Sequence, residues 1–142
     1  EITATTHIYS NCEVIIGDRT RIGRNSAIRA AKNIKIGEDC LIANYVRIYD
    51  YNGHPLSPED PEDMRRRRNM SHVPPDEVRS IIIEDNVWIG ENAFIQAGVK
   101  IGWNSVVSAN SVVTKDVPEN VIVMGNPART TYWFKDKNKE SW

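Results

Sequence analysis

Branched aliphatic residues recur at every sixth position along most of this chain, with polar and turn-forming residues between them. The series comprises Ile16, Ile22, Ile28 and Ile34, then, after a slip of two positions, Ile36, Ile42 and Ile48, and finally Ile83, Ile89, Ile95, Ile101, Val107 and Val113. Six residues are a multiple of the two-residue period of a strand, whereas a helix would carry such positions around all its faces. The pattern therefore predicts extended chain with one aliphatic face.

Two other positions of the six-residue unit are also specialised. Three places after the aliphatic stand residue types that tolerate positive φ: Asn25, Asp39, Asn86, Asn92, Gly98, Asn104, Asn110 and Asp116. Four places after it stand mostly small residues: Thr20, Ser26, Cys40, Val46, Val87, Ala93, Val99, Ser105, Ser111 and Val117. Each unit thus has a large inward residue, a small inward residue and a corner. Stacked units of this kind predict an all-β parallel solenoid, because a β-sandwich has no reason to keep this spacing.

The rhythm stops between Ile48 and Ile83, where prolines and charges are frequent. Prolines and charges would break the layers of a solenoid, so we expect this stretch, about 49–80, to leave it as an outward excursion loop. Because the repeat resumes afterwards, we predict one β-helix domain over 1–131, followed by a C-terminal tail or cap over 132–142. The run Arg65–Arg68 is interpreted as a solvated basic patch balanced by nearby acidic residues, with an anion clamp as the alternative.

Composition narrows the function classes. The chain has 142 residues and a net charge of -1, so no global field draws it to nucleic acid or a membrane. No apolar run reaches the roughly 18 residues of a transmembrane helix. The two cysteines, Cys12 and Cys40, have no metal or redox spacing, which favours a reducing, cytoplasmic setting. The chain begins at Glu1, so its start says nothing about targeting.

Four motifs in the second half carry a family resemblance: Trp88-Ile89-Gly90, Gly98-Val99-Lys100-Ile101-Gly102, the turn from Ala109 to Asp116, and Gly125-Asn126-Pro127-Ala128. Together they resemble the hexapeptide-repeat acyltransferases, in particular the maltose, galactoside and capsular-sugar O-acetyltransferases. The resemblance implies a left-handed parallel β-helix, acetyl-CoA as the donor, a saccharide hydroxyl as the acceptor, and a homotrimer with active sites between subunits.

His54 stands at the position of the catalytic histidine of that family, in the sequence Asn-Gly-His-Pro-Leu. An acceptor hydroxyl must lose its proton as it attacks a thioester, and an imidazole that titrates near pH 6.5 is largely neutral and able to accept it at pH 7. The resemblance thus implies that His54 is the general base of a direct transfer in a ternary complex. Asp50 and Asn52 are candidates to orient it.

The same resemblance implies a donor groove between two solenoids, in which small residues let the pantetheine arm approach the backbone. Its candidate residues are Ala97, Gly98, Ser108, Ala109, Thr114, Lys115 and Arg129. Lys115 and Arg129 are candidates to meet the nucleotide phosphates. Trp88 matches an aromatic residue near the family's acyl-transfer site. No metal is expected.

The chain departs from the sugar-acetylating branch at one acceptor position. Where that branch has an aspartate, this chain has Ala31, and the cationic Arg29 stands close by. A simple galactoside or maltose acceptor is therefore disfavoured, and Arg29 is a candidate acceptor contact for an acidic or differently shaped glycan. The alternatives are an N-acyltransferase acting on an amino sugar, a γ-type carbonic anhydrase, for which the histidine spacing does not fit, and a catalytically silent structural solenoid.

Overall fold

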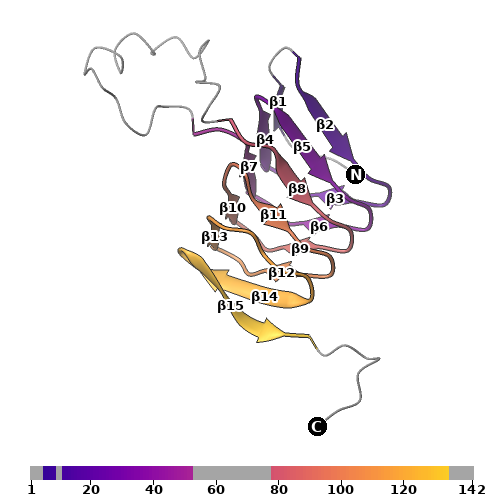
Figure 1. The fold of residues 1–142 in the computed structure, drawn as a ribbon. Helices are drawn as coiled ribbons and strands as arrows, with labels where there is room; N and C mark the ends of the chain where they lie inside the picture. The colour runs from indigo at the N-terminus through magenta and orange to yellow at the C-terminus, as the bar shows by residue number, and fades with distance from the viewer. Residues whose placement is uncertain (1–4, 9–10, 53–77, 135–142) are drawn as a thin grey trace, which may run out of the picture.

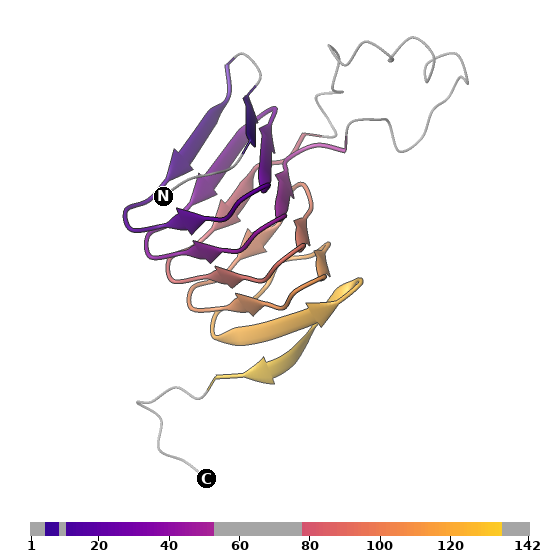
Figure 2. The same cartoon turned by 180° about the vertical axis from the view of Figure 1, so that it is seen from behind.

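The computed structural model describes residues 5–8, 11–52 and 78–134, and every regular element among them is a β-strand. The strands wind into a left-handed parallel β-helix of about five turns, which confirms the predicted fold class (Figure 1). Figure 2 shows the same stack of coils from behind, with three strand-bearing sides joined by tight corners. Within the part of the chain described, no helix has the length and apolar character needed to cross a membrane.

Each side of the solenoid is one sheet. The five-stranded sheet contains β1 (Thr5–Ile8), β4 (Ala27–Ala30), β7 (Arg47–Tyr49), β10 (Phe94–Ile95) and β13 (Val112–Val113). The four-stranded sheet contains β2 (Glu13–Ile16), β5 (Asn33–Ile36), β8 (Ile81–Ile83) and β11 (Lys100–Ile101). The six-stranded sheet contains β3 (Arg21–Ile22), β6 (Leu41–Ile42), β9 (Trp88–Ile89), β12 (Val106–Val107), β14 (Val121–Gly125) and β15 (Ala128–Trp133).

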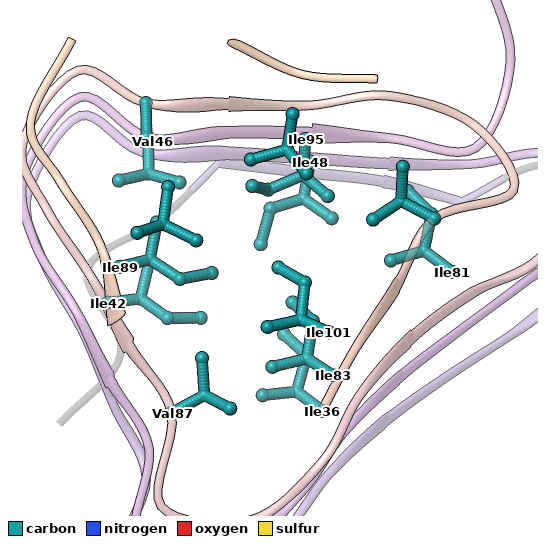
Figure 3. Close-up of a cluster of buried hydrophobic side chains, with 14 of the residues drawn as sticks. Ile36, Ile42, Val46, Ile48, Ile81, Ile83, Val87, Ile89, Ile95 and Ile101 are labelled. Carbon is teal, nitrogen blue, oxygen red and sulfur yellow. The ribbon is translucent and has the colours of Figure 1, made fainter. Parts of the chain in front are cut away.

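The interior is filled by the aliphatic series that the sequence predicts. Figure 3 shows Ile36, Ile83 and Ile101 stacked on one wall, and Ile42 and Ile89 together on the next wall. All five side chains are buried, and the parallel register places them directly over one another. Burying one such side chain contributes about 1.5–3 kcal/mol, so these ladders supply the main driving force for folding. The small residues predicted to point inward are also buried.

The stretch after Ile48 does not change the register between coils. Ile36 pairs with Ile83, Leu41 with Trp88 and Arg47 with Phe94, and all three pairs span the same number of residues. A constant offset on all three sides means that the coil continues in phase across the interruption. This confirms that the solenoid resumes after the interruption.

The slip of two positions near Ile34 has a local cause. Ala27 pairs with Arg47 and Glu13 pairs with Asn33, so these coils have twenty residues, whereas Trp88 pairs with Val106 eighteen residues on. The two extra residues widen the corner between β4 and β5. Ala30 remains buried at this corner, so the additional chain bends without disturbing the core.

The predicted corner residues have positive φ, with one exception. Asp116 does not, because the last coil is shorter: Ile101 meets Val117 only sixteen residues on. Its Oδ1 instead accepts a hydrogen bond of 2.8 Å from the Lys100 backbone N–H. The sequence pattern did not include four further residues with positive φ, namely Asn11, Arg19, Tyr45 and Asn120. Arg19 (φ 59°) and Tyr45 (φ 60°) adopt the left-handed conformation without being typical turn residues.

The chain ends its solenoid by reversing direction. β15 pairs with β14 in antiparallel orientation and is the last strand of the six-stranded sheet. This hairpin pairs the outer edge of β14, and β15 becomes the edge strand at the C-terminal end of this sheet. Residues 135–142, most of the predicted tail, lie outside the described residues.

Candidate functional site

One corner of the solenoid carries the start and the end of the interruption; we call it the loop-bearing corner (residues 30–32, 50–52, 78–80, 96–98 and 114–116). Backbone hydrogen bonds form a ladder from coil to coil here. The Asp50 N–H donates to the Arg29 carbonyl (3.2 Å), the Arg79 N–H to the Asp50 carbonyl (2.9 Å) and the Gly98 N–H to the Arg79 carbonyl (3.0 Å). The described chain leaves the corner after Asn52 and rejoins it at Val78. The predicted base, His54, lies two positions beyond Asn52, outside the described residues, as do Arg65–Arg68.

Asp50 closes the widened corner of the preceding coil. Its side chain is fully buried, and its two oxygens accept hydrogen bonds from the backbone N–H groups of Ala31 (2.7 Å) and Lys32 (2.8 Å). Burial raises the pKa of the Asp50 carboxyl, and the backbone donors offset part of that rise. Asp50 thus satisfies donors that the two extra residues create. A role in orienting His54 stays a prediction.

The candidate donor-groove residues at this corner are Ala97, Gly98, Thr114 and Lys115, and Gly98 exposes backbone because it has no side chain. Ala97 is buried, whereas Gly98, Thr114 and Lys115 are exposed. Gly98 has φ +84°, and a Cβ there would lie 3.1 Å from the Cβ and 3.3 Å from the Nε of Arg79. The Arg79 side chain therefore lies against the glycine. Sequence reasoning missed Arg79, because only the backbone ladder shows that the residue returning from the interruption stands over Gly98.

Arg29 is held on the outer face of the five-stranded sheet by two aromatic residues. It pairs with Tyr49 across β4 and β7, and its guanidinium carbon lies 4.7 Å from the centre of the Tyr49 ring. Tyr49 in turn meets Phe94 edge to face, with ring centres 5.3 Å apart. Cation–π and T-shaped contacts of this geometry are favourable. Neither aromatic was predicted from the sequence, because the contact depends on the register between coils.

The remaining predicted residues lie on another part of the protomer. Trp88 points outward from β9, and Ser108 and Ala109 occupy the corner between the six- and five-stranded sheets. Gly90 lies beneath them, since a Cβ there would come 2.5 Å from the Ala109 backbone nitrogen. Arg129 is exposed on β15, where its Nη1 donates to the Ala128 carbonyl (2.9 Å). Within one chain, the structure therefore divides the candidates into two groups.

A surface hollow of about 290 Å³ lies between β3 and β6, and its lining includes Arg21, Arg24, Leu41 and Asn44. Leu41 is the register neighbour of Trp88, so the hollow lies one coil away from that tryptophan. None of the predicted site residues lines this hollow.

Both cysteines behave as structural residues. Cys40 is buried, its thiol donates to the Glu84 carbonyl (3.1 Å), and burial raises its pKa. A buried thiol with a raised pKa is a poor nucleophile. Cys12 is half-buried, and its thiol donates to the Ala30 carbonyl (3.3 Å). The prediction that Cys40 is a core residue is confirmed, which disfavours an acyl-cysteine intermediate on it.

Comparisons with known proteins match the repeats directly. The family described as bacterial transferase hexapeptide (six repeats) matches residues 80–115, and the hexapeptide repeat of succinyl-transferase matches residues 13–49. The galactoside O-acetyltransferase of Escherichia coli K12 is 37% identical over 140 residues, covering 88% of this chain and 64% of that protein. The polysialic acid O-acetyltransferase of Escherichia coli O1:K1 is 38% identical over 118 residues, covering 82% of this chain and 35% of that protein.

A solved structure extends the similarity to the whole fold. It is the hexapeptide-repeat-containing acetyltransferase of Vibrio cholerae O1 biovar eltor, crystallised with acetyl coenzyme A. Its TM-score is 0.73 at 35% sequence identity, covering 95% of this chain and 73% of that chain. This chain therefore belongs to the hexapeptide-repeat acetyltransferase family, as its sequence motifs predict. It spans less than two thirds of the length of the galactoside enzyme, namely 64%.

Proposed function

We propose that this protein transfers an acetyl group from acetyl-CoA to a hydroxyl of a saccharide or of a cell-surface glycan precursor. The observation that carries this proposal is the similarity described above: two relatives are named as saccharide O-acetyltransferases, and the matched structure was solved with acetyl-CoA. The candidate residues away from the loop-bearing corner are called the Trp88 group below: Trp88, Ser108, Ala109 and Arg129. A cytoplasmic location remains a prediction.

His54 is proposed as the general base. The acceptor hydroxyl would lose its proton to the imidazole while its oxygen attacks the thioester carbon. Collapse of the tetrahedral intermediate would break the C–S bond and release CoA as the thiolate, which can take up the proton held by the imidazolium. Asn52 is exposed at the edge of the loop-bearing corner, and Asp50 is buried beside it, so a rigid wall precedes His54 in the chain. A backbone N–H at the site would stabilise the oxyanion.

The donor is proposed to bind along the small exposed residues at the two corners. Gly98 and Ala109 are small and exposed, so the pantetheine arm can approach their backbone. The Gly98 N–H already donates to the Arg79 carbonyl, so a contact with the donor at Gly98 would be made through its C=O. Thr114, Lys115 and Arg129 are exposed in the C-terminal coils, where the two cations can meet phosphates. Ala97 is buried, so its side chain supports the corner, and any contact with the donor would be made through its backbone.

We further propose that the working unit is a homotrimer. On one chain the predicted site residues form two groups, one at the loop-bearing corner and one around Trp88 and Ala109, so a single groove would join groups from two chains. The outer face of the six-stranded sheet also carries an apolar column in continuous register: Leu41, Trp88, Val106, Ile122 and Tyr132. Leu41, Trp88 and Tyr132 are exposed in the single chain, which is typical of an interface.

The test is the His54→Ala variant, assayed by thiol release from acetyl-CoA across a panel of sugars, nucleotide sugars and glycan fragments. Loss of a general base lowers turnover by about 10²–10⁴-fold, while acetyl-CoA binding should persist. His72→Ala, in the same stretch of sequence, is the matched control and should retain turnover. Unchanged turnover in His54→Ala would show that His54 is not the general base. Locating the acetyl group on oxygen or nitrogen of the product separates O-transfer from the alternative N-transfer.

A further inference from the structure

Arg29 lies on the outer surface of the five-stranded sheet and has no carboxylate partner among the described residues. It is half-buried, and one face of its guanidinium lies against the Tyr49 ring. No ion pair or side-chain hydrogen bond among the described residues involves its N–H groups. Arg19 shows the contrast, since its guanidinium contacts Glu38 (2.9 Å) and Asp39 (2.6 Å).

A guanidinium stacked in this way keeps its donors for a ligand. The ring occupies the face, whereas the five N–H donors lie in the plane and suit a carboxylate or a phosphate. Tyr49 is itself fixed by Phe94, so Arg29 loses less side-chain freedom when it binds an anion. The stack therefore presents a preorganised cation on the five-stranded sheet.

A second cation, Arg79, lies two steps from Arg29 along the same backbone ladder. The backbone ladder connects Arg29, Asp50, Arg79 and Gly98 in that order, and adjacent steps of such a ladder lie about 4.7–4.9 Å apart. Arg79 is exposed over Gly98 and forms no ion pair within the described residues. Asp50, which lies between the two arginines, turns its carboxylate inward to the Ala31 and Lys32 amides. The Asp50 carboxylate therefore does not neutralise either arginine at the outer surface.

The position of Arg29 separates it from the two cations of the proposed donor groove. Lys115 and Arg129 lie in the last coils, whereas Arg29 lies on β4, on the N-terminal side of the loop-bearing β7. Lys115 and Arg129 can meet the CoA phosphates at one end of the solenoid, so Arg29 is left for a different ligand on the other side of the corner.

We propose that Arg29 recognises an anionic group on the saccharide acceptor, that Arg79 supplies a second positive charge on the same backbone ladder, and that Tyr49 is a positioning residue for Arg29. The acceptor class is then a glycan that carries a carboxylate or a phosphate. This inference rests on the proposed acetyl transfer, because it names the acceptor of that same reaction.

The experiment compares oligosaccharides of a carboxylated sugar with the same oligosaccharides after reduction of the carboxyl to hydroxymethyl. A third arm contains hexose phosphates, which distinguishes a phosphate from a carboxylate as the recognised anion. With acetyl-CoA saturating, we expect Arg29→Gln to raise KM for the anionic acceptor about tenfold, as for loss of a charge-assisted hydrogen bond, with kcat within about twofold. KM for the reduced acceptor should not change. Arg79→Gln should act in the same direction with a smaller effect.

Two controls isolate the geometry. Arg19→Gln removes the same charge at another corner and should leave KM for both acceptors unchanged. Tyr49→Phe keeps the aromatic face and should retain the wild-type KM, whereas Tyr49→Leu removes it and should raise KM for the anionic acceptor a few-fold. An equal effect of Tyr49→Phe and Tyr49→Leu would overturn the positioning role.

Binding of the free sugars, followed by NMR line broadening, separates the two proposals. Acetyl transfer with no preference for the anionic acceptor, or with no change in Arg29→Gln, would overturn the anion site and leave the transferase proposal intact. Anion binding lost in Arg29→Gln, without transfer to any sugar, would support the anion site and overturn the transferase proposal. If the protein neither binds the anionic sugar nor transfers acetyl to any sugar, both proposals are wrong.

Discussion

At the scale of single residues, Asp50 links a change in the repeat to the stability of the site. The corner between β4 and β5 contains two more residues than the later corners, and the buried Asp50 carboxylate accepts the Ala31 and Lys32 amides there. A backbone donor that loses its acceptor in a partly buried corner is costly, so the widened corner depends on this one side chain.

We therefore predict that Asp50→Asn destabilises the protein. An asparagine keeps one acceptor oxygen but turns an NH2 group toward a backbone N–H, so one backbone donor of this partly buried corner loses its partner. The expected loss is about 1–3 kcal/mol in the free energy of unfolding, measured by urea denaturation followed by tryptophan fluorescence.

Asp116→Asn is the matched control for this prediction. Its carboxylate is exposed and accepts one backbone bond, from Lys100, which an asparagine Oδ1 can keep. We expect a change within about 0.5 kcal/mol. Equal small effects of the two variants would show that the Asp50 bonds do not stabilise the corner.

At the scale of the element, the corners are held by side chains that repeat from coil to coil. Asn86 Nδ2 donates to Asn104 Oδ1 (2.7 Å), and Asn104 Nδ2 donates to Asn120 Oδ1 (2.8 Å). All three residues have positive φ. An asparagine therefore serves twice, because it tolerates the left-handed conformation and its amide links one coil to the next.

Two substitutions of Asn104 separate these contributions. Asn104→Ala loses both amide bonds and places a Cβ-bearing residue without local hydrogen bonds at φ near 56°, so we expect a loss of about 1–3 kcal/mol in unfolding free energy. Asn104→Gly loses the same bonds but accepts the backbone conformation, so its loss should be smaller. Thermal unfolding by circular dichroism measures both. If Ala and Gly cost the same, the backbone conformation is not the reason for asparagine here.

At the scale of the whole molecule, one chain presents an incomplete arrangement. The loop-bearing corner and the Trp88 group do not converge within the protomer, while an apolar column runs along the outer face of the six-stranded sheet. The proposed trimer would cover that column and bring the two groups together from neighbouring chains.

The prediction at this scale concerns Trp88, which is 51% exposed in the single chain. We expect the wild-type protein to sediment as a trimer and Trp88→Glu to raise its dissociation constant at least about a hundredfold, because an unpaired carboxylate would be buried. Trp103→Glu is the control, since Trp103 is 46% exposed at a different corner. Analytical ultracentrifugation measures all three proteins. A monomeric wild type, or equal dissociation of both variants, would contradict the proposed interface.

Much of the fold could be predicted because the repeat is local and self-similar. Ile42, Ile89 and Val107 point inward for the same reason, and the asparagine corners follow from their backbone preference. Arg19 and Tyr45 were missed as corners, because stacking on neighbouring coils imposes the left-handed conformation on residue types that do not favour it.

The candidate site was predictable only in part. The motif around Trp88 and the position of His54 come from the family resemblance, and the comparisons confirm the family. The partners of Arg29 and the location of Arg79 did not follow from any motif. Each depends on which residues of separate coils become neighbours, and those are far apart in the chain.

The sequence by itself determined the solenoid, its inward and outward faces and the place where the chain departs from it, because these depend on alternation and turn preference within each unit. Only the tertiary structure decided that Tyr49 stacks on Arg29, that Arg79 covers Gly98 and that Asp50 closes the preceding corner. The physical reason is the register between coils: coils of twenty, eighteen and sixteen residues bring different side chains into contact, and that register is set by the packing of the whole stack.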